Sequence, residues 1–231
     1  THPGISKPLI IDSLKRVSAY SQLLQSNRHL FVRTVCLLSS FAFFTAMGDK
    51  FGSDTLAANT LIMQLVMMAA YGMDGFAFAA EGLAGNRLGA GDLQGFYRAV
   101  KRCALWSMVS AILMSALFAL LKAPIMLVLT DIPAVMALMD SYYPWLLLLP
   151  LVAAPSYLLD GIFIGAAETR YMMITMLISV LGVYLPLWYL TRDLGNHGLW
   201  LAFTAFNGAR GISLYLCYVQ LNRSGSWVRE A

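Results

Sequence analysis

Six long apolar runs, separated by short polar or charged segments, make up most of this chain of 231 residues. A helix needs about 20 predominantly apolar residues to cross a bilayer core, and each run has roughly this length. The piece from Ile125 to Leu129 is too short to span and is followed by Asp131 and Pro133, so we expect a surface segment there. The six expected spans cover residues 30–47, 56–80, 103–121, 142–165, 171–190 and 199–219.

The composition agrees with this pattern. Hydrophobic residues make up 59% of the chain and charged residues only 12%, whereas soluble domains are about 25% charged. The expected fold class is therefore an all-α integral membrane protein with lipid as its surroundings. The basic residues fall in short segments between the apolar runs and form no single soluble face, so no nucleic-acid partner is expected.

The basic residues also predict an orientation. Twelve of the 16 Lys and Arg residues lie before the first span, at its start (Arg33) or after the even-numbered spans. Three lie in the opposite loops, and Arg210 lies inside a span. The positive-inside rule then places both termini in the cytoplasm.

The segments outside the spans are short. Residues 1–29 contain Ile11, Leu14, Val17 and Leu24 at near-helical spacing, which favours an amphipathic helix on the membrane surface; a solvated linker is the alternative. Residues 222–231 form a cytoplasmic tail.

Three charged residues lie too far inside the expected spans to be assigned to loops: Asp74, Asp160 and Arg210. An aspartate at the centre of a membrane helix costs roughly 2.5 to 3.5 kcal/mol, so these groups should face the protein interior or a water-filled path. Arg210 can reach either aspartate, and such a pair would hold helices together or balance a site that binds protons or cations. Glu81, seven residues after Asp74, either extends the same acidic face or marks the membrane exit.

Other residues in the spans are candidates for lining a substrate cavity. Methionine and phenylalanine suit a pliable pocket for bulky apolar cations, although both residue types also serve in ordinary packing. Tyrosines precede Asp74 and Asp160 by three residues, and span amides can hydrogen-bond between helices. The candidate lining residues are Phe43, Phe44, Asn59, Met63, Met67, Tyr71 and Tyr157.

Catalytic and metal-binding patterns are missing from the sequence. It has no His-Glu-x-x-His, Gly-x-Ser-x-Gly or phosphate-loop motif, and Cys36, Cys103 and Cys217 have no metal-ligand spacing. We therefore expect neither an enzyme nor a metal site.

Four segments carry a resemblance to a known family: Asp74-Gly-Phe-Ala-Phe-Ala-Ala-Glu81, Gly85-Asn-Arg-Leu-Gly-Ala-Gly91, Leu159-Asp-Gly-Ile-Phe-Ile-Gly-Ala166 and Gly195-Asn-His-Gly-Leu-Trp-Leu-Ala202. Their order and spacing resemble the DinF-type branch of the multidrug and toxic compound extrusion (MATE) family. The resemblance implies the C-terminal six-helix lobe of a two-lobe transporter, with an N-terminal lobe as its partner in the same or a separate polypeptide.

The resemblance also bears on the site. In one branch of the family, a cation site uses an aspartate in this lobe's fourth helix, and Asp160 falls at the matching place. That branch also uses a glutamate in the lobe's first helix, whereas the span 30–47 contains no acid. In DinF-type members, the proton-linked carboxylate is assigned to the N-terminal lobe.

The function implied is half of a bacterial inner-membrane antiporter that exports organic cations or drugs by alternating access, coupled to H⁺ or Na⁺ and without another cofactor. Asp160, Asp74 and Glu81 would serve the cation, proton or substrate, with Arg210 balancing their charge. Two alternatives are a lipid-linked saccharide flippase of the same superfamily and a non-transporting membrane assembly subunit.

Overall fold

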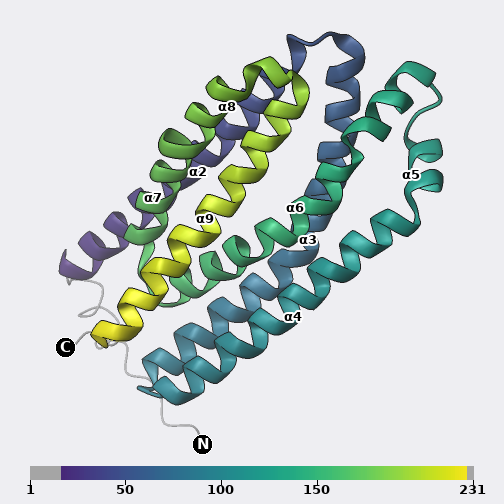
Figure 1. Cartoon of the computed structure of the whole chain (residues 1–231). Helices are drawn as coiled ribbons and strands as arrows, with labels where there is room; N and C mark the ends of the chain where they lie inside the picture. The colour runs from purple at the N-terminus through teal and green to yellow at the C-terminus, as the bar shows by residue number, and fades with distance from the viewer. Residues whose placement is uncertain (1–16, 228–231) are drawn as a thin grey trace, which may run out of the picture.

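The computed structural model describes residues 17–227, and every regular element in that range is helical. The long helices run side by side along one axis, with a short helix, α5, at one end of the bundle (Figure 1). The helices are α2 (Val17–Asp49), α3 (Ser53–Gly89), α4 (Leu93–Leu120), α5 (Lys122–Leu129), α6 (Pro133–Gly165), α7 (Thr169–Ile178), α8 (Leu185–Thr191) and α9 (Asn196–Ser224). The expected all-α membrane fold is confirmed.

The first helix is longer than the first predicted span. α2 begins at Val17 and runs without a break to Asp49, because no Gly or Pro interrupts residues 17–47. Residues 17–29 of the predicted linker therefore continue the first span in one helix. Ile11 and Leu14, on which the prediction of a surface helix partly depends, lie outside the described residues.

Five helical segments in the described part of the chain are long and apolar enough to cross a membrane: Asn27–Asp49, Ser53–Gly89, Leu93–Leu120, Pro133–Gly165 and Thr169–Leu194. α9, the sixth predicted span, is 29 residues long but is not among them. Its Asn196, Asn207 and Arg210 make it more polar, and all three are buried in the bundle. A helix whose polar residues face protein can carry them through a bilayer, so the sixth span remains a prediction.

α3 and α6 meet backbone to backbone. Gly161 and Gly165 of α6 face α3 so closely that an added Cβ would overlap the carbonyl oxygen of Ala77 or Glu81, respectively. Small residues allow this approach between membrane helices, where dispersion contacts replace the hydrophobic effect as the main attraction. The packing joins the two helices that carry the predicted carboxylates.

The fourth and fifth predicted spans depart from a straight, regular helix in different ways. α6 remains helical through Pro144, Pro150 and Pro155 and bends along its length (Figure 1). The fifth span is divided into α7, a π-helical turn η1 (Ser179–Tyr184), and α8. In the π turn, the Tyr184 hydroxyl donates a hydrogen bond to the Ser40 carbonyl oxygen of α2, at 3.3 Å. This contact attaches the irregular turn to the first helix.

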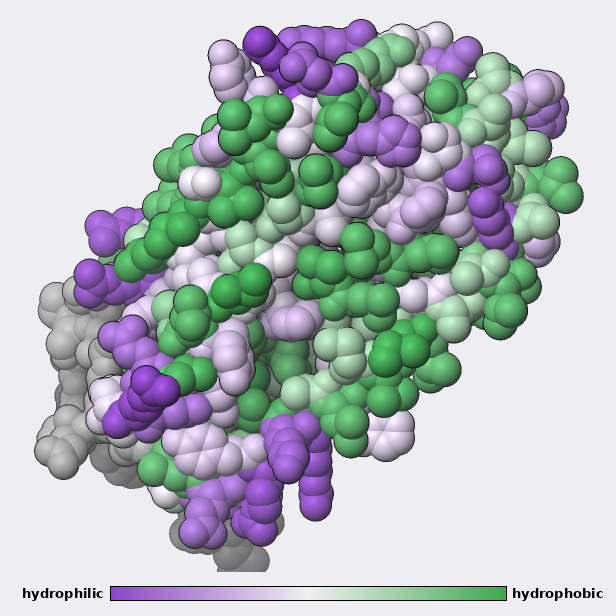
Figure 2. Space-filling view, in the orientation of Figure 1, coloured by the Kyte–Doolittle hydropathy of each residue, from purple (hydrophilic) through white to green (hydrophobic). Residues whose placement is uncertain are grey.

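The outer surface has the polarity expected for a membrane protein. Figure 2 shows hydrophobic side chains across the middle of the visible face and hydrophilic ones gathered toward its two ends. On α4 the exposed apolar side chains include Leu105, Trp106, Leu113 and Leu120. A surface with so many exposed apolar side chains is suited to lipid rather than water.

Asp92 forms the turn between α3 and α4. Its carboxylate accepts a hydrogen bond from the Gly95 N–H, at 2.8 Å, and thereby caps the start of α4. It also accepts one from Arg87, at 2.9 Å. The Gly95 N–H first, and then Arg87, hold the pKa of the Asp92 carboxyl below its usual value.

The contact between α3 and α6 predicts a selective effect of added side-chain volume. We expect Gly161→Ala to destabilise the protein by about 1 to 3 kcal/mol, because the new methyl group overlaps the α3 backbone. Gly75→Ala on α3 is the matched control, because it adds the same group where no atom lies within 4 Å. Thermal unfolding in detergent compares the two, and equal melting temperatures would contradict this account of the packing.

The Asp92 cap predicts a pH-dependent contribution to stability. Because its pKa is lowered in the folded protein, the ionised carboxylate stabilises the fold above the unfolded-chain pKa of about 3.9. This contribution is lost as the pH falls through the lower native pKa. We expect Asp92→Ala to melt below the wild type at pH 7 and the gap to close toward about pH 3. Asp92→Asn, which keeps a capping oxygen, should lie between them at pH 7. A gap that stays constant over this range would disprove the assignment.

Candidate functional site

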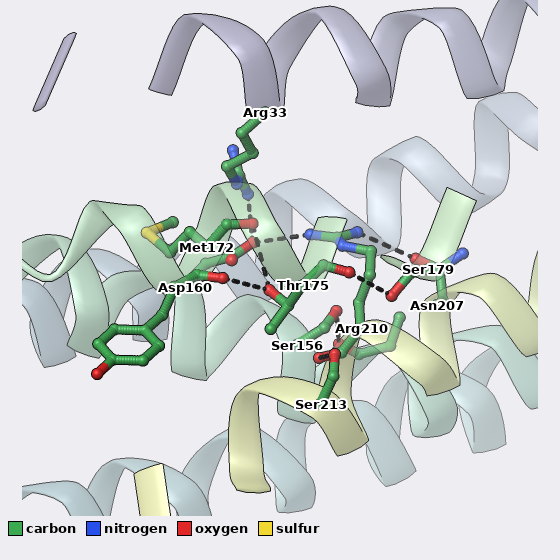
Figure 3. Close-up of polar contacts among 11 residues, drawn as sticks. Arg33, Ser156, Asp160, Met172, Thr175, Ser179, Asn207, Arg210 and Ser213 are labelled. Carbon is green, nitrogen blue, oxygen red and sulfur yellow. Dashed lines mark hydrogen bonds and ion pairs between the residues drawn. The ribbon is translucent and has the colours of Figure 1, made fainter. Parts of the chain in front are cut away.

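Asp160 is the centre of an ion-pair cluster inside the bundle. It lies on α6, is 6% exposed, and accepts a hydrogen bond from the Arg210 guanidinium of α9 at 2.7 Å. The guanidinium of Arg33, on α2, contacts the same carboxylate oxygen. Figure 3 shows the two arginines reaching Asp160 from different helices. One carboxylate therefore joins α2, α6 and α9.

Arg33 corrects the sequence analysis, which counted it among the basic residues flanking the first span. The structure places it on the inner side of α2, with only 17% of its side chain exposed. Its Nε is buried and has no hydrogen-bond partner among the described residues. The signal in the sequence is a cation within the apolar stretch Leu30–Val35, but no local pattern identifies Asp160, 127 residues away, as its partner.

Arg210 is more deeply buried than Arg33, with 2% exposure. Besides Asp160, its guanidinium donates to the Asn207 side-chain oxygen at 3.4 Å and lies 5.6 Å from the centre of the Phe206 ring. The Asn207 amide in turn donates to the Phe203 carbonyl oxygen at 2.9 Å. Buried charges need such partners, because leaving one unpaired typically costs about 3 to 5 kcal/mol.

Asp74 is the second carboxylate of the cluster and differs from the first. It lies on α3, is partly exposed, and forms no ion pair within the described residues. Arg33 and Asp160 nevertheless act on it electrostatically. With Asp74 ionised, two aspartates balance the two arginines, so Asp74 is the member that can change charge without breaking a direct ion pair.

Tyr157 lies one turn before Asp160 on α6 and is subject to the charges of all four cluster residues. It also lines a hollow of about 10 Å³ between α2, α3, α6 and α9, with Met73 and Asn207 among its other walls. This hollow has room for about one water molecule. Drug-sized ligands need several hundred Å³, so the hollow cannot by itself hold such a substrate.

Glu81 lies outside the ion-pair cluster. Its backbone contacts Gly165, and its partly exposed side chain borders a separate hollow with Phe78 and Asn86. Seven residues along a helix place it about 10 Å from Asp74. The structure therefore does not bring this third predicted acid together with the two aspartates.

The remaining predicted lining residues have varied environments. Phe44 and Asn59 are buried in the lobe's core: the Phe44 ring packs on Trp200, and the Asn59 amide exchanges hydrogen bonds with Asn196. Tyr71 is 73% exposed. Phe43 and Met63 pack partly buried against the main core, and the Phe43 ring makes edge contacts with Tyr184 and Trp188. Met67 is also partly buried.

Among residues 17–227, no three His, Cys, Asp or Glu side chains come together in an arrangement that could hold a metal ion.

Comparisons with known proteins identify the family. The MatE family profile matches residues 30–190. DNA damage-inducible protein F of Escherichia coli K12 is 36% identical over 208 residues, covering 90% of this chain and 45% of that protein. The chain thus spans about half the length of this relative.

Solved structures agree on the fold. The Vibrio cholerae MATE transporter VcmN in its bent form superimposes with a TM-score of 0.80 at 16% identity, covering 93% of this chain and 50% of that one. The eukaryotic MATE transporter AtDTX14 gives a TM-score of 0.79 at 16% identity, covering 94% and 48%. These matches favour neither the flippase nor the assembly-subunit alternative. The family match over most of the chain shows that this protein belongs to the MatE family of multidrug and toxic compound extrusion transporters.

Proposed function

We propose that this chain is one lobe of an ion-coupled antiporter that exports organic cations by alternating access, together with a second six-helix lobe. Family membership and the half-length match support this proposal. The hollow beside Tyr157 is in keeping with it, since this space between the helices of one lobe is too small for a substrate of drug size. The bias of basic residues supports an inner-membrane orientation with both termini in the cytoplasm.

The observation that carries the proposal is the unequal pairing of the two aspartates. Asp160 is held by two guanidiniums, whereas Asp74 has no ion pair among the described residues. A cation that binds Asp160 must share its carboxylate with the Arg33 and Arg210 guanidiniums, or displace them. Asp74 needs no such exchange. We therefore assign the coupling H⁺ or Na⁺ to Asp74 and a fixed, helix-joining role to Asp160.

This assignment gives a physical route for coupling. When Asp74 is ionised, its negative charge draws Arg33 and α2 toward α3 and favours a cationic substrate nearby. Protonation or Na⁺ binding removes that charge, which weakens both attractions. The two charge states of Asp74 then differ in their affinity for substrate and in their preferred packing of α2, as ligand-driven population shifts require.

Substitution of the two aspartates should give different defects. In the complete two-lobe transporter, we expect Asp74→Asn to lower ion-driven efflux of a cationic dye at least tenfold, with little change in melting temperature. We expect Asp160→Asn to lower stability by about 3 to 5 kcal/mol, because it leaves the buried Arg210 and the partly buried Arg33 without their carboxylate. Dye efflux in vesicles and thermal unfolding in detergent measure these effects.

Asp54→Asn is the matched control, because it makes the same change at an exposed position on α3. It should leave efflux unchanged and lower stability by no more than about 1 kcal/mol, the usual contribution of a carboxylate in the first turn of a helix. Unchanged ion-driven efflux in Asp74→Asn would disprove the coupling role of Asp74. A fully stable Asp160→Asn would disprove the helix-joining role of Asp160.

A further inference from the structure

A second cluster of cations lies away from the ion-pair cluster, where α3 ends and α4 begins. A cavity of about 300 Å³ there is lined by Leu83 and Arg87 of α3 and by Gly95, Arg98, Ala99 and Arg102 of α4. The four α4 positions follow the spacing i, i+3, i+4 and i+7, so they share one face of the helix. The periodicity of α4 therefore gives this cavity a wall with two arginines.

The cavity has a surplus of positive charge. Arg87 is paired with Asp92, at 2.9 Å. Arg98 and Arg102, in contrast, form no ion pair within the described part of the chain, and Arg98 donates only to the backbone oxygen of Gln94, at 3.4 Å. Two guanidiniums with free donors form a recognition site for a phosphate group, because their paired N–H groups match its oxygens.

The surroundings of the cavity indicate a lipid rather than a soluble anion. One turn beyond Arg102 on α4, Leu105 and Trp106 are 62% and 59% exposed. Both lie in a segment that is apolar enough to span the membrane. Figure 2 shows hydrophilic side chains below the lower part of α4, next to hydrophobic ones farther along the same helix. Cations followed within one turn by exposed apolar and indole groups match the order of headgroup and acyl chain in a bilayer leaflet.

We propose that this cavity binds the phosphate headgroup of an anionic phospholipid, with an acyl chain lying along Leu105 and Trp106. Arg98 and Arg102 hold the phosphate, and Arg87 borders the opposite side from the end of α3. The proposal requires only that the α3–α4 turn lies at a membrane surface, and it does not depend on the coupling role of Asp74.

Tryptophan quenching tests the site, because Trp106 adjoins the proposed acyl chain. The purified protein in detergent is titrated with phosphatidylglycerol carrying brominated acyl chains and, separately, with phosphatidylcholine carrying the same chains. We expect phosphatidylglycerol to bind more tightly and Trp106→Phe to remove most of its extra quenching. The double variant Arg98→Gln/Arg102→Gln should weaken phosphatidylglycerol binding by up to about 30-fold, the effect expected for two cations at an anionic surface.

Two further variants separate this site from general attraction to charge. Arg98→Lys/Arg102→Lys keeps the charge but removes the paired N–H groups, so it should lose part of the preference for phosphatidylglycerol. Arg170→Gln/Arg223→Gln removes two exposed cations outside the cavity and should leave the preference unchanged. Equal binding of the two lipids, or an equal loss in the Arg170/Arg223 variant, would overturn the proposal. Displacement of the brominated phosphatidylglycerol by millimolar inorganic phosphate would instead identify a site for a soluble anion.

Discussion

The carboxylate of Asp160 is buried in the helix bundle, and two arginines from other helices pair with it. In a lipid bilayer an unpaired charge is costly, so this carboxylate requires such partners. This double ion pair links α2, α6 and α9, because the carboxylate on α6 pairs with one cation from each of the other two helices. α3 is held differently, by direct backbone contact at Gly161 and Gly165 of α6. The lobe thus combines one electrostatic junction with one steric junction, and both lie on α6.

This arrangement distinguishes two carboxylates that look alike in the sequence. Both aspartates follow a tyrosine by three residues and precede a glycine. Tyr157 is surrounded by the charges of the cluster, whereas Tyr71 is mostly exposed. A repeated local pattern therefore does not produce a repeated environment, because the environment depends on which helices pack on each side. Asp160 pairs with cations of α2 and α9, while Asp74 is partly exposed and has no ion pair among the described residues.

The fold was largely predictable because the length and hydropathy of each run directly limit what can cross a bilayer. The pair of Asp160 and Arg210 could be anticipated for a similar reason, since a charge in a span requires a partner. The role of Arg33 could not be anticipated, because a cation near the start of an apolar run is equally typical of the segment that flanks a membrane span. Phe44 and Asn59 illustrate another limit: a phenylalanine or an amide in a span has the same sequence signature in a core as in a cavity. Only packing against Trp200 and Asn196 distinguishes the two cases.

α3 connects the two charged regions of the lobe. Asp74 lies near its middle, and Arg87 lies in its last turn, beside the proposed lipid cavity. Because the intervening residues Ala77 and Glu81 contact α6 through their backbone, this part of α3 cannot shift relative to α6 without losing close packing. Displacement of the α3–α4 turn would therefore move α3 and α6 together. In the proposed coupling, a charge change at Asp74 therefore acts on α2, through Arg33, and not along α6. On this proposal, the glycine contacts restrict the movable part of the site to the interface between α2 and α3.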